Sequence, residues 1–149
     1  MIRLSRKTML AIEAVTDVAY NARPNPVQAR DITERQGIPQ RYLEQVMQQL
    51  VRAGVLKGVR GPRGGYTLAR ERRRVTMGDV VRVVAALEAE GDEEVAGGEL
   101  GSKVVAPLWE ELQGDLLSRL DAVTMEDLCR EAAARGVRRA DEARADFEI

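Results

Sequence analysis

Two segments with helical periodicity meet at Gly37, and this junction restricts the folds open to the chain. Residues 28–36 have the spacing of a short helix, and glycine at 37 predicts its end because glycine tolerates the left-handed backbone of a tight turn. Pro39 then opens a longer helix, since the first helical position needs no N–H donor. The inward stripe of that helix is expected to comprise Leu43, Val46, Met47, Leu50 and Val51. The outer face of the longer helix is polar. The two helices and the glycine turn between them therefore predict a helix-turn-helix unit.

The next segment changes from helical to strand character. Residues 55–60 and 66–69 have strand composition, and Gly-Pro-Arg-Gly-Gly at 61–65 predicts a tight hairpin between them. A nucleotide-phosphate loop is the alternative interpretation, but the Gly-Lys-Ser/Thr ending and the dinucleotide glycine spacing are both missing. We therefore expect a mostly α-helical fold with a small β-hairpin, a winged helix-turn-helix followed by a long helix.

The chain divides into three expected regions. Residues 1–75 form the winged helix-turn-helix domain, in which Ser5 caps the first helix. Residues 76–134 form a helical region, with a mobile acidic loop at 89–103 and a long helix opened by Pro107. Residues 135–149 are expected to be a flexible C-terminal tail. Capping-box spacing within the second region predicts two helix starts, at Thr76–Asp79 and Thr124–Asp127.

The residue inventory excludes several classes of protein. One cysteine and no histidine in 149 residues rule out Ser-His-Asp and Cys-His nucleophile systems and imidazole-ligated zinc. We therefore expect no catalytic residue and no enzymatic activity. No apolar run approaches the roughly 18 residues of a membrane span. Glu13 and Asp17 interrupt the stretch that a secretory signal would need, so a cytoplasmic protein without a membrane partner is expected.

Charge is distributed unevenly along the chain. Residues 1–75 carry 15 Lys and Arg against 6 Asp and Glu, whereas residues 76–149 carry 8 against 18. A net charge of +9 on the half with the polar helix and the wing predicts contact with a polyanion. The major groove of B-DNA admits a helix, and arginine on a wing suits a narrow minor groove. Double-stranded DNA is therefore the expected partner.

Five stretches of the chain, beginning at Arg3, Asp31, Tyr42, Val59 and Thr124, together resemble one known family, the Rrf-two family of winged-helix bacterial regulators. It includes the iron–sulfur-cluster regulator, the nitric-oxide-sensing repressor and the cysteine-metabolism repressor. The resemblance covers most of residues 1–134. The matching stretches are Arg3-Leu-Ser-Arg-Lys7, Asp31-Ile-Thr-Glu-Arg-Gln-Gly-Ile38, Tyr42-Leu-Glu-Gln45, Val59-Arg-Gly-Pro-Arg-Gly-Gly-Tyr66 and Thr124-Met-Glu-Asp-Leu128.

The resemblance implies which side chains meet DNA. Arg41, Glu44 and Arg60 take base-reading positions. Backbone-contact positions fall on Ser5, Arg6, Lys7, Tyr42, Gln45 and Gly64. The candidate DNA-binding set is completed by Pro39, Gln40, Gly61, Arg63, Gly65 and Tyr66. The family also implies a homodimer on a near-palindromic operator in the bacterial nucleoid, formed through the long helix at about 107–121. The expected interface is the stripe Trp109, Leu112, Leu116 and Leu120.

The sequence departs from the cluster-binding members of this family. They carry three cysteines in the loop before the long helix, whereas residues 88–108 contain no cysteine or histidine here. Lys103 and Ala106 stand where a cysteine and a histidine are expected. Iron–sulfur clusters need several thiolate ligands or comparable donors, so we expect no metal and no cofactor. Cys129 shares a stripe with apolar residues, which favours packing in the core; a redox-sensing thiol is the alternative.

The tail ends in Asp146-Phe147-Glu148-Ile149. It resembles the isoleucine-ended tails with which the cysteine-metabolism repressor and serine acetyltransferase enter the active site of cysteine synthase. Phe147 and Ile149 are thus candidate partner-binding residues, with an ordinary frayed terminus as the alternative. The expected function is a cluster-free, sequence-specific repressor of transcription that controls cysteine metabolism through binding of cysteine synthase. The alternatives are a redox-sensing regulator and a protein-interaction subunit that no longer binds an operator.

Overall fold

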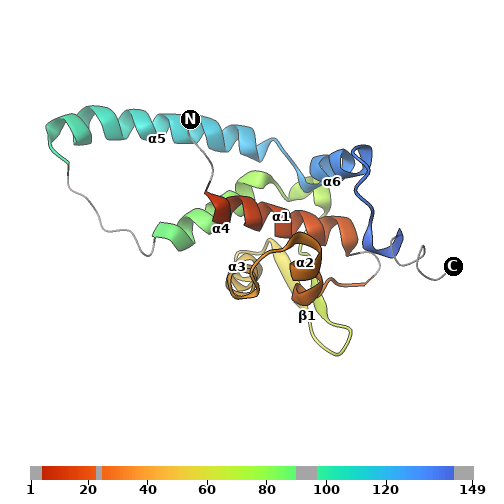
Figure 1. Ribbon diagram of the computed structural model, residues 1–149. Helices are drawn as coiled ribbons and strands as arrows, with labels where there is room; N and C mark the ends of the chain where they lie inside the picture. Colours follow the sequence, from red (N-terminus) through yellow and green to blue (C-terminus); the bar gives the residue numbers. More distant parts are fainter. Residues whose placement is uncertain (1–4, 23–24, 90–96, 143–149) are drawn as a thin grey trace.

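The computed structural model describes residues 5–22, 25–89 and 97–142 (Figure 1). It confirms a mostly helical fold with one two-stranded antiparallel hairpin. In chain order the elements are α1 (Arg6–Asn21), α2 (Ala29–Gln36), α3 (Gln40–Arg52), β1 (Leu56–Val59), β2 (Gly65–Leu68), η1 (Arg72–Arg74), α4 (Met77–Ala89), η2 (Gly101–Val105), α5 (Ala106–Asp121) and α6 (Met125–Ala134). Within the described ranges, no helix is long and apolar enough to cross a membrane.

The hydrophobic core surrounds α1, which contacts α2, α3, β2, α4 and α6. Its small apolar positions Ala11, Ala14, Val15 and Val18 are completely buried, so the neighbouring helices can approach closely. Helices α4 and α6 complete this core, so residues beyond 75 pack directly against the winged helix-turn-helix. The other large fully buried side chains are Ile32, Ile38, Leu43, Met47, Leu50, Leu56, Met125, Val46, Val75 and Val80.

The predicted helix caps are all confirmed. The Ser5 hydroxyl accepts a hydrogen bond from the Thr8 amide at 3.2 Å. At the start of α4, the Thr76 amide donates to Asp79 and the Asp79 amide donates back to the Thr76 hydroxyl. Thr124 and Asp127 form the same reciprocal pair at the start of α6. Each pair satisfies two backbone donors that a helix end would leave without partners.

The long helix begins earlier than the sequence predicts. Residues from 99 onward are helical, so the expectations of a loop through 103 and of a start at Pro107 are wrong. A π-helical turn, η2, precedes α5, and within it the Ala106 amide donates to the Gly101 carbonyl. This wider turn makes room for the proline ring, which would otherwise clash with the carbonyl one α-helical turn back. The rest of the expected loop, 90–96, lies outside the described residues.

The segment after α6 packs against the end of α1. The Tyr20 hydroxyl donates to the Val137 carbonyl, and Asn21 Oδ1 accepts from the Ala140 amide at 2.8 Å. Residues 140–142 form a further helical turn. The first half of the expected flexible tail is therefore held by two hydrogen bonds to α1, a tertiary contact that its polar composition does not reveal. Phe147 and Ile149 lie outside the described residues.

Candidate nucleic-acid interface

Gly37 makes the turn between α2 and α3. It has a φ of 67°, and its N–H group donates to the Thr33 carbonyl at 2.9 Å. Glycine adopts this left-handed conformation without a steric penalty. Ile38 is buried after it, and Pro39 is the N-cap residue before the first turn of α3. The turn thereby fixes both the start and the direction of α3.

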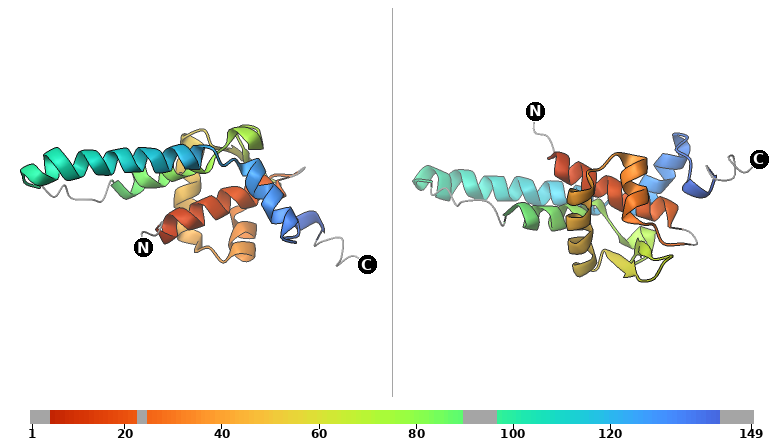
Figure 2. Two further views of the ribbon diagram at one scale, coloured as in Figure 1. Left: turned by 90° about the horizontal axis from the view of Figure 1, so that it is seen from above. Right: turned by 60° about the horizontal axis from the view of Figure 1, so that its bottom comes forward.

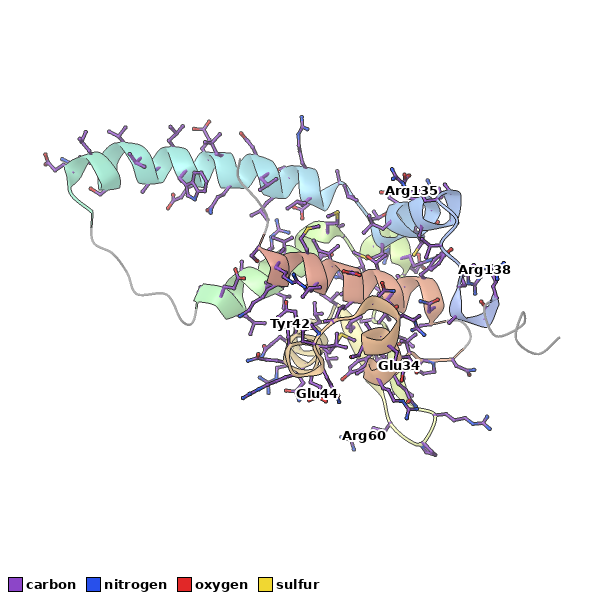
Figure 3. The ribbon with its side chains drawn as sticks, in the orientation of Figure 1. Glu34, Tyr42, Glu44, Arg60, Arg135 and Arg138 are labelled. Atoms are coloured by element: carbon purple, nitrogen blue, oxygen red, sulfur yellow. The ribbon has the colours of Figure 1, made fainter. Side chains whose placement is uncertain are left out.

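The two faces of α3 differ sharply in exposure. Leu43, Val46, Met47 and Leu50 are completely buried, as their helical spacing predicts. The opposite face exposes Gln40, Arg41, Glu44, Gln45, Gln48 and Arg52. Gln40 Nε2 donates to Glu44 Oε1 at 3.1 Å, so the Glu44 carboxylate is oriented by its own helix. Figure 3 shows Glu44 directed away from α1, on the side of the molecule opposite α5.

The wing brings arginine to the same side as α3. Strands β1 and β2 pair from Leu56–Leu68 to Val59–Gly65, and β1 contacts α3. The connecting turn exposes Arg60, Gly61 and Arg63. Arg60 and Glu44 lie on one side of the protein (Figure 3). The exposed face of α3 together with the wing turn is called the reading face below.

Gly64 and Gly65 are required by the packing of the wing itself. A Cβ on Gly64, which is buried, would lie 2.2 Å from the Val59 carbonyl oxygen, and one on Gly65 would lie 2.4 Å from the Val27 carbonyl oxygen. Val27 and Tyr66 exchange two backbone hydrogen bonds of 2.9 and 2.7 Å. This bridge fastens the wing to the segment before α2. The sequence predicted a tight hairpin at these glycines and did not reveal this contact.

Replacing Gly65 with alanine is expected to displace the wing and lower the free energy of unfolding by about 1–3 kcal/mol, as overpacking does elsewhere. The matched control is Gly58→Ala in the same hairpin, where an added Cβ meets nothing within 4 Å. Urea denaturation of both variants measures the difference. Equal stabilities would mean that the bridge between Val27 and Tyr66 does not constrain the wing.

The start of α1 is joined to α3 and α4. The Tyr42 hydroxyl donates to the Lys7 carbonyl, and the Ser5 hydroxyl donates to Glu88 Oε1 at 3.0 Å. Burial, and secondarily the charge of Glu88, raises the pKa of Tyr42 to about 12, so its hydroxyl remains a donor at neutral pH. Arg6 is exposed beside this junction. The structure thus brings the candidate residues at the start of α1 next to Tyr42 of α3. The local sequence gives no signal for the hydrogen bond between Ser5 and Glu88.

An ion pair between the buried Asp17 and the partly exposed Arg35 positions α2 against α1. The Asp17 side chain is completely buried and accepts two hydrogen bonds from Arg35, at 2.8 and 3.0 Å, and a third from Gln36 at 2.8 Å. The bond to Asp17 also raises the pKa of Arg35. Because the Asp17 carboxylate binds both Arg35 and Gln36 at the end of α2, it orients α2, the helix that precedes the reading face. Sequence reasoning used Asp17 only to argue against a secretory signal.

The long helix, which lies on the side of the protein opposite the reading face, exposes an apolar stripe (Figure 3). Val105, Leu108, Trp109, Leu112 and Leu116 are each about half exposed. We call these five residues the α5 stripe. Leu120, expected in the same interface, is instead only 9% exposed, because α5 ends there and the chain turns back into α6. Both views of Figure 2 show α5 projecting beyond the other helices.

The only thiol of the chain lies in the core. Cys129 is 3% exposed and belongs to the same buried cluster as Met125 and Val75. This placement supports the packing interpretation over redox sensing. It also puts the thiol on α6, distant in sequence from residues 88–108, which supply no cysteine or histidine. The donors present do not fit a thiolate-ligated iron–sulfur cluster.

A helix-turn-helix with an exposed polar second helix and an adjacent hairpin defines a winged helix-turn-helix regulator of transcription. The chain belongs to the Rrf2 family, described as iron-dependent transcriptional regulators, whose model matches residues 4–131. This confirms the family that the sequence motifs indicated, and its members are regulators rather than enzymes.

Individual relatives agree with this assignment. The HTH-type transcriptional regulator IscR of Xenorhabdus nematophila is 35% identical over 133 residues, covering 87% of this chain and 80% of the relative. The solved structure of T. potens IscR matches with a TM-score of 0.72 and 32% identity, covering 95% and 96% of the two chains. CymR, the global cysteine regulator of B. subtilis, matches with a TM-score of 0.67 and 27% identity, covering 88% and 98%.

Proposed function

We propose that this regulator binds a near-palindromic DNA operator as a homodimer and represses transcription. The observation that carries the proposal is the placement of Glu44 and Arg60 on one side of the protein, with α5 on the other (Figure 3). Such an arrangement lets two copies join through the α5 stripe while both reading faces meet DNA. Closed two-fold dimers and palindromic sites have matching symmetry.

Each side chain of the reading face suits a distinct contact. Arg41 and Arg60 can each donate two hydrogen bonds to a guanine edge, and Glu44 can accept one from a cytosine amino group. Arg6 and Lys7 add positive charge for phosphates. Tyr42 acts through its bond to the Lys7 carbonyl, which holds the start of α1 beside α3.

Genome-wide footprinting of the protein identifies the operator, on which base reading is tested. Arg41→Ala and Arg60→Ala are each expected to lose roughly 1–3 kcal/mol of discrimination between the operator and a scrambled duplex. The control is Arg135→Ala, which removes an exposed arginine from the end of α6 (Figure 3). If either arginine variant weakens binding to both duplexes equally, that arginine contacts phosphates only.

We also propose that the protein works without an iron–sulfur cluster. The donor set supports this: one buried thiol, no histidine and, within the described residues, no group of three potential ligands placed around a metal. Protein purified without oxygen is expected to be colourless and free of stoichiometric iron. A visible charge-transfer band that disappears on chelation would contradict the proposal.

A more specific proposal concerns the signal to which the regulator responds. The likeness to CymR and the isoleucine-ended tail support binding of cysteine synthase through Ile149, with control of cysteine metabolism as the result. A C-terminal carboxylate held by backbone donors, with its side chain in a pocket, is a recurrent mode of recognition. Calorimetry would compare the intact chain with one lacking Ile149. No binding by the intact chain, or equal binding by both, would exclude this partner.

A further inference from the structure

A cavity of about 360 Å³ lies between α1, η1, α6 and the segment that follows α6. Its wall carries Arg72, Arg130, Arg139, Glu126 and Glu142, and Cys129 lines its inner side. The hydrogen bond from Tyr20 to the Val137 carbonyl holds the last part of this wall against α1. The volume lies in the range of small-molecule sites in proteins.

The arginines in the wall have few partners of their own. Arg72 is half-buried and makes no hydrogen bond or ion pair with any residue that the structure describes. Arg139 approaches Asp141 at 3.3 Å through Nη2, but its Nε is buried without a hydrogen-bond partner. Arg130 is 3.9 Å from Glu126 and 4.0 Å from Asp127, which is long for a charged hydrogen bond. Three guanidinium groups with few close acceptors give this wall a positive charge, so it favours an incoming anion.

The two glutamates give the cavity a second chemical character. Glu142 accepts a hydrogen bond from the Arg139 backbone amide at 3.2 Å, which fixes its carboxylate at the rim. Glu126 lies one helical turn before Arg130 and does not make a close pair with it. A ligand with only negative charge would meet repulsion from these carboxylates, whereas a ligand that also carries an ammonium group would not.

We propose that this cavity binds a small zwitterionic metabolite with a carboxylate and an ammonium group, as in an amino acid. Arg72 and Arg139 hold the carboxylate, and Glu126 and Glu142 face the ammonium group. The cavity is also close to the wing in sequence, because η1, which carries Arg72 of the cavity wall, follows β2 after only three residues. Occupancy therefore shifts DNA affinity, a consequence that rests on the proposed function, whereas ligand binding itself does not.

The test measures binding to the full chain without DNA. The common amino acids are screened by thermal shift at millimolar concentration, beside acetate and succinate, which lack the ammonium group, and ethylamine, which lacks the carboxylate. Calorimetry of the amino acid with the largest shift is then repeated with Arg72→Gln, Arg139→Gln and the control Arg135→Gln. Arg135 is an exposed arginine just after α6 that does not line the cavity.

An amino acid is expected to bind, the singly charged compounds are not, and each cavity variant should weaken binding by roughly tenfold or more. The control should bind like the unaltered protein. The proposal is wrong if no amino acid binds, if the singly charged compounds bind equally well, or if both cavity variants keep full affinity. Failure here leaves operator binding untouched, because that is measured separately on DNA.

Discussion

Replacing Leu116 with glutamate is expected to leave the protein monomeric and to weaken operator binding by roughly a hundredfold or more, the gain that joining two binding units provides. Leu116 is 49% exposed at the C-terminal end of the α5 stripe, so each protomer can accept the new charge without unfolding. In a two-fold interface the stripe meets the same stripe of the partner, so the substitution would bury two carboxylates, one from each protomer, in an apolar contact. Light scattering and operator titration measure the two effects.

The control for this substitution is Ser118→Glu. Ser118 is exposed on α5 but lies half a turn away from Leu116, outside the α5 stripe. This variant should remain dimeric and bind the operator normally. A dimeric Leu116→Glu protein would place the interface elsewhere on the molecule.

Replacing Arg35 with methionine is expected to lower the free energy of unfolding by about 3–5 kcal/mol, because it leaves the buried Asp17 carboxylate with Gln36 as its remaining side-chain donor. This loss is the cost of leaving one buried charge without its partner, which differs from the net contribution of the ion pair to stability. A double variant, Asp17→Leu with Arg35→Met, removes the stranded charge and should recover most of the loss.

Denaturant unfolding of the two variants provides the comparison, with Arg73→Met as the control. Arg73 pairs with Glu71 where both side chains are about two-thirds exposed, so its loss should change stability little. If Arg35→Met were as stable as that control, the buried carboxylate would have to find water or another donor. The role of Asp17 in holding α2 would then be wrong.

The local features of the fold could be predicted because short-range chemistry determines them. Gly37 marks a left-handed turn, and the reciprocal bonds of Thr76 with Asp79 follow from their spacing. The buried stripe of α3 follows from helical periodicity. Each of these signals lies within a few residues, so one sequence is enough to see it.

The features that could not be predicted depend on distant contacts. Asp17 of α1 accepts hydrogen bonds from Arg35 and Gln36 of α2. Ser5 donates to Glu88, which is 83 residues away in the sequence. Leu120 continues the apolar pattern of α5 but is buried by the turn into α6. The start of the long helix was misplaced because proline usually opens a helix, whereas here a π-helical turn accommodates it.

Helix α1 contacts α3, α2 and the wall of the cavity. Its first turn supplies the Lys7 carbonyl to Tyr42, its fourth turn supplies Asp17 to α2, and its last turn supplies Tyr20 to the wall of the cavity. A rigid helix with these three contacts connects the reading face to the far side of the core.

Sequence-specific DNA binding is tested most directly by titrating the footprinted operator and a scrambled duplex with the protein over a range of salt concentrations. Affinity for the operator should exceed that for the scrambled duplex. It should fall about a thousandfold or more between about 50 and 200 mM salt if the dimer neutralises six or more phosphates. Equal affinity for both duplexes, or binding that does not depend on salt, would contradict the account and identify the chain as a protein-interaction subunit that has kept the fold alone.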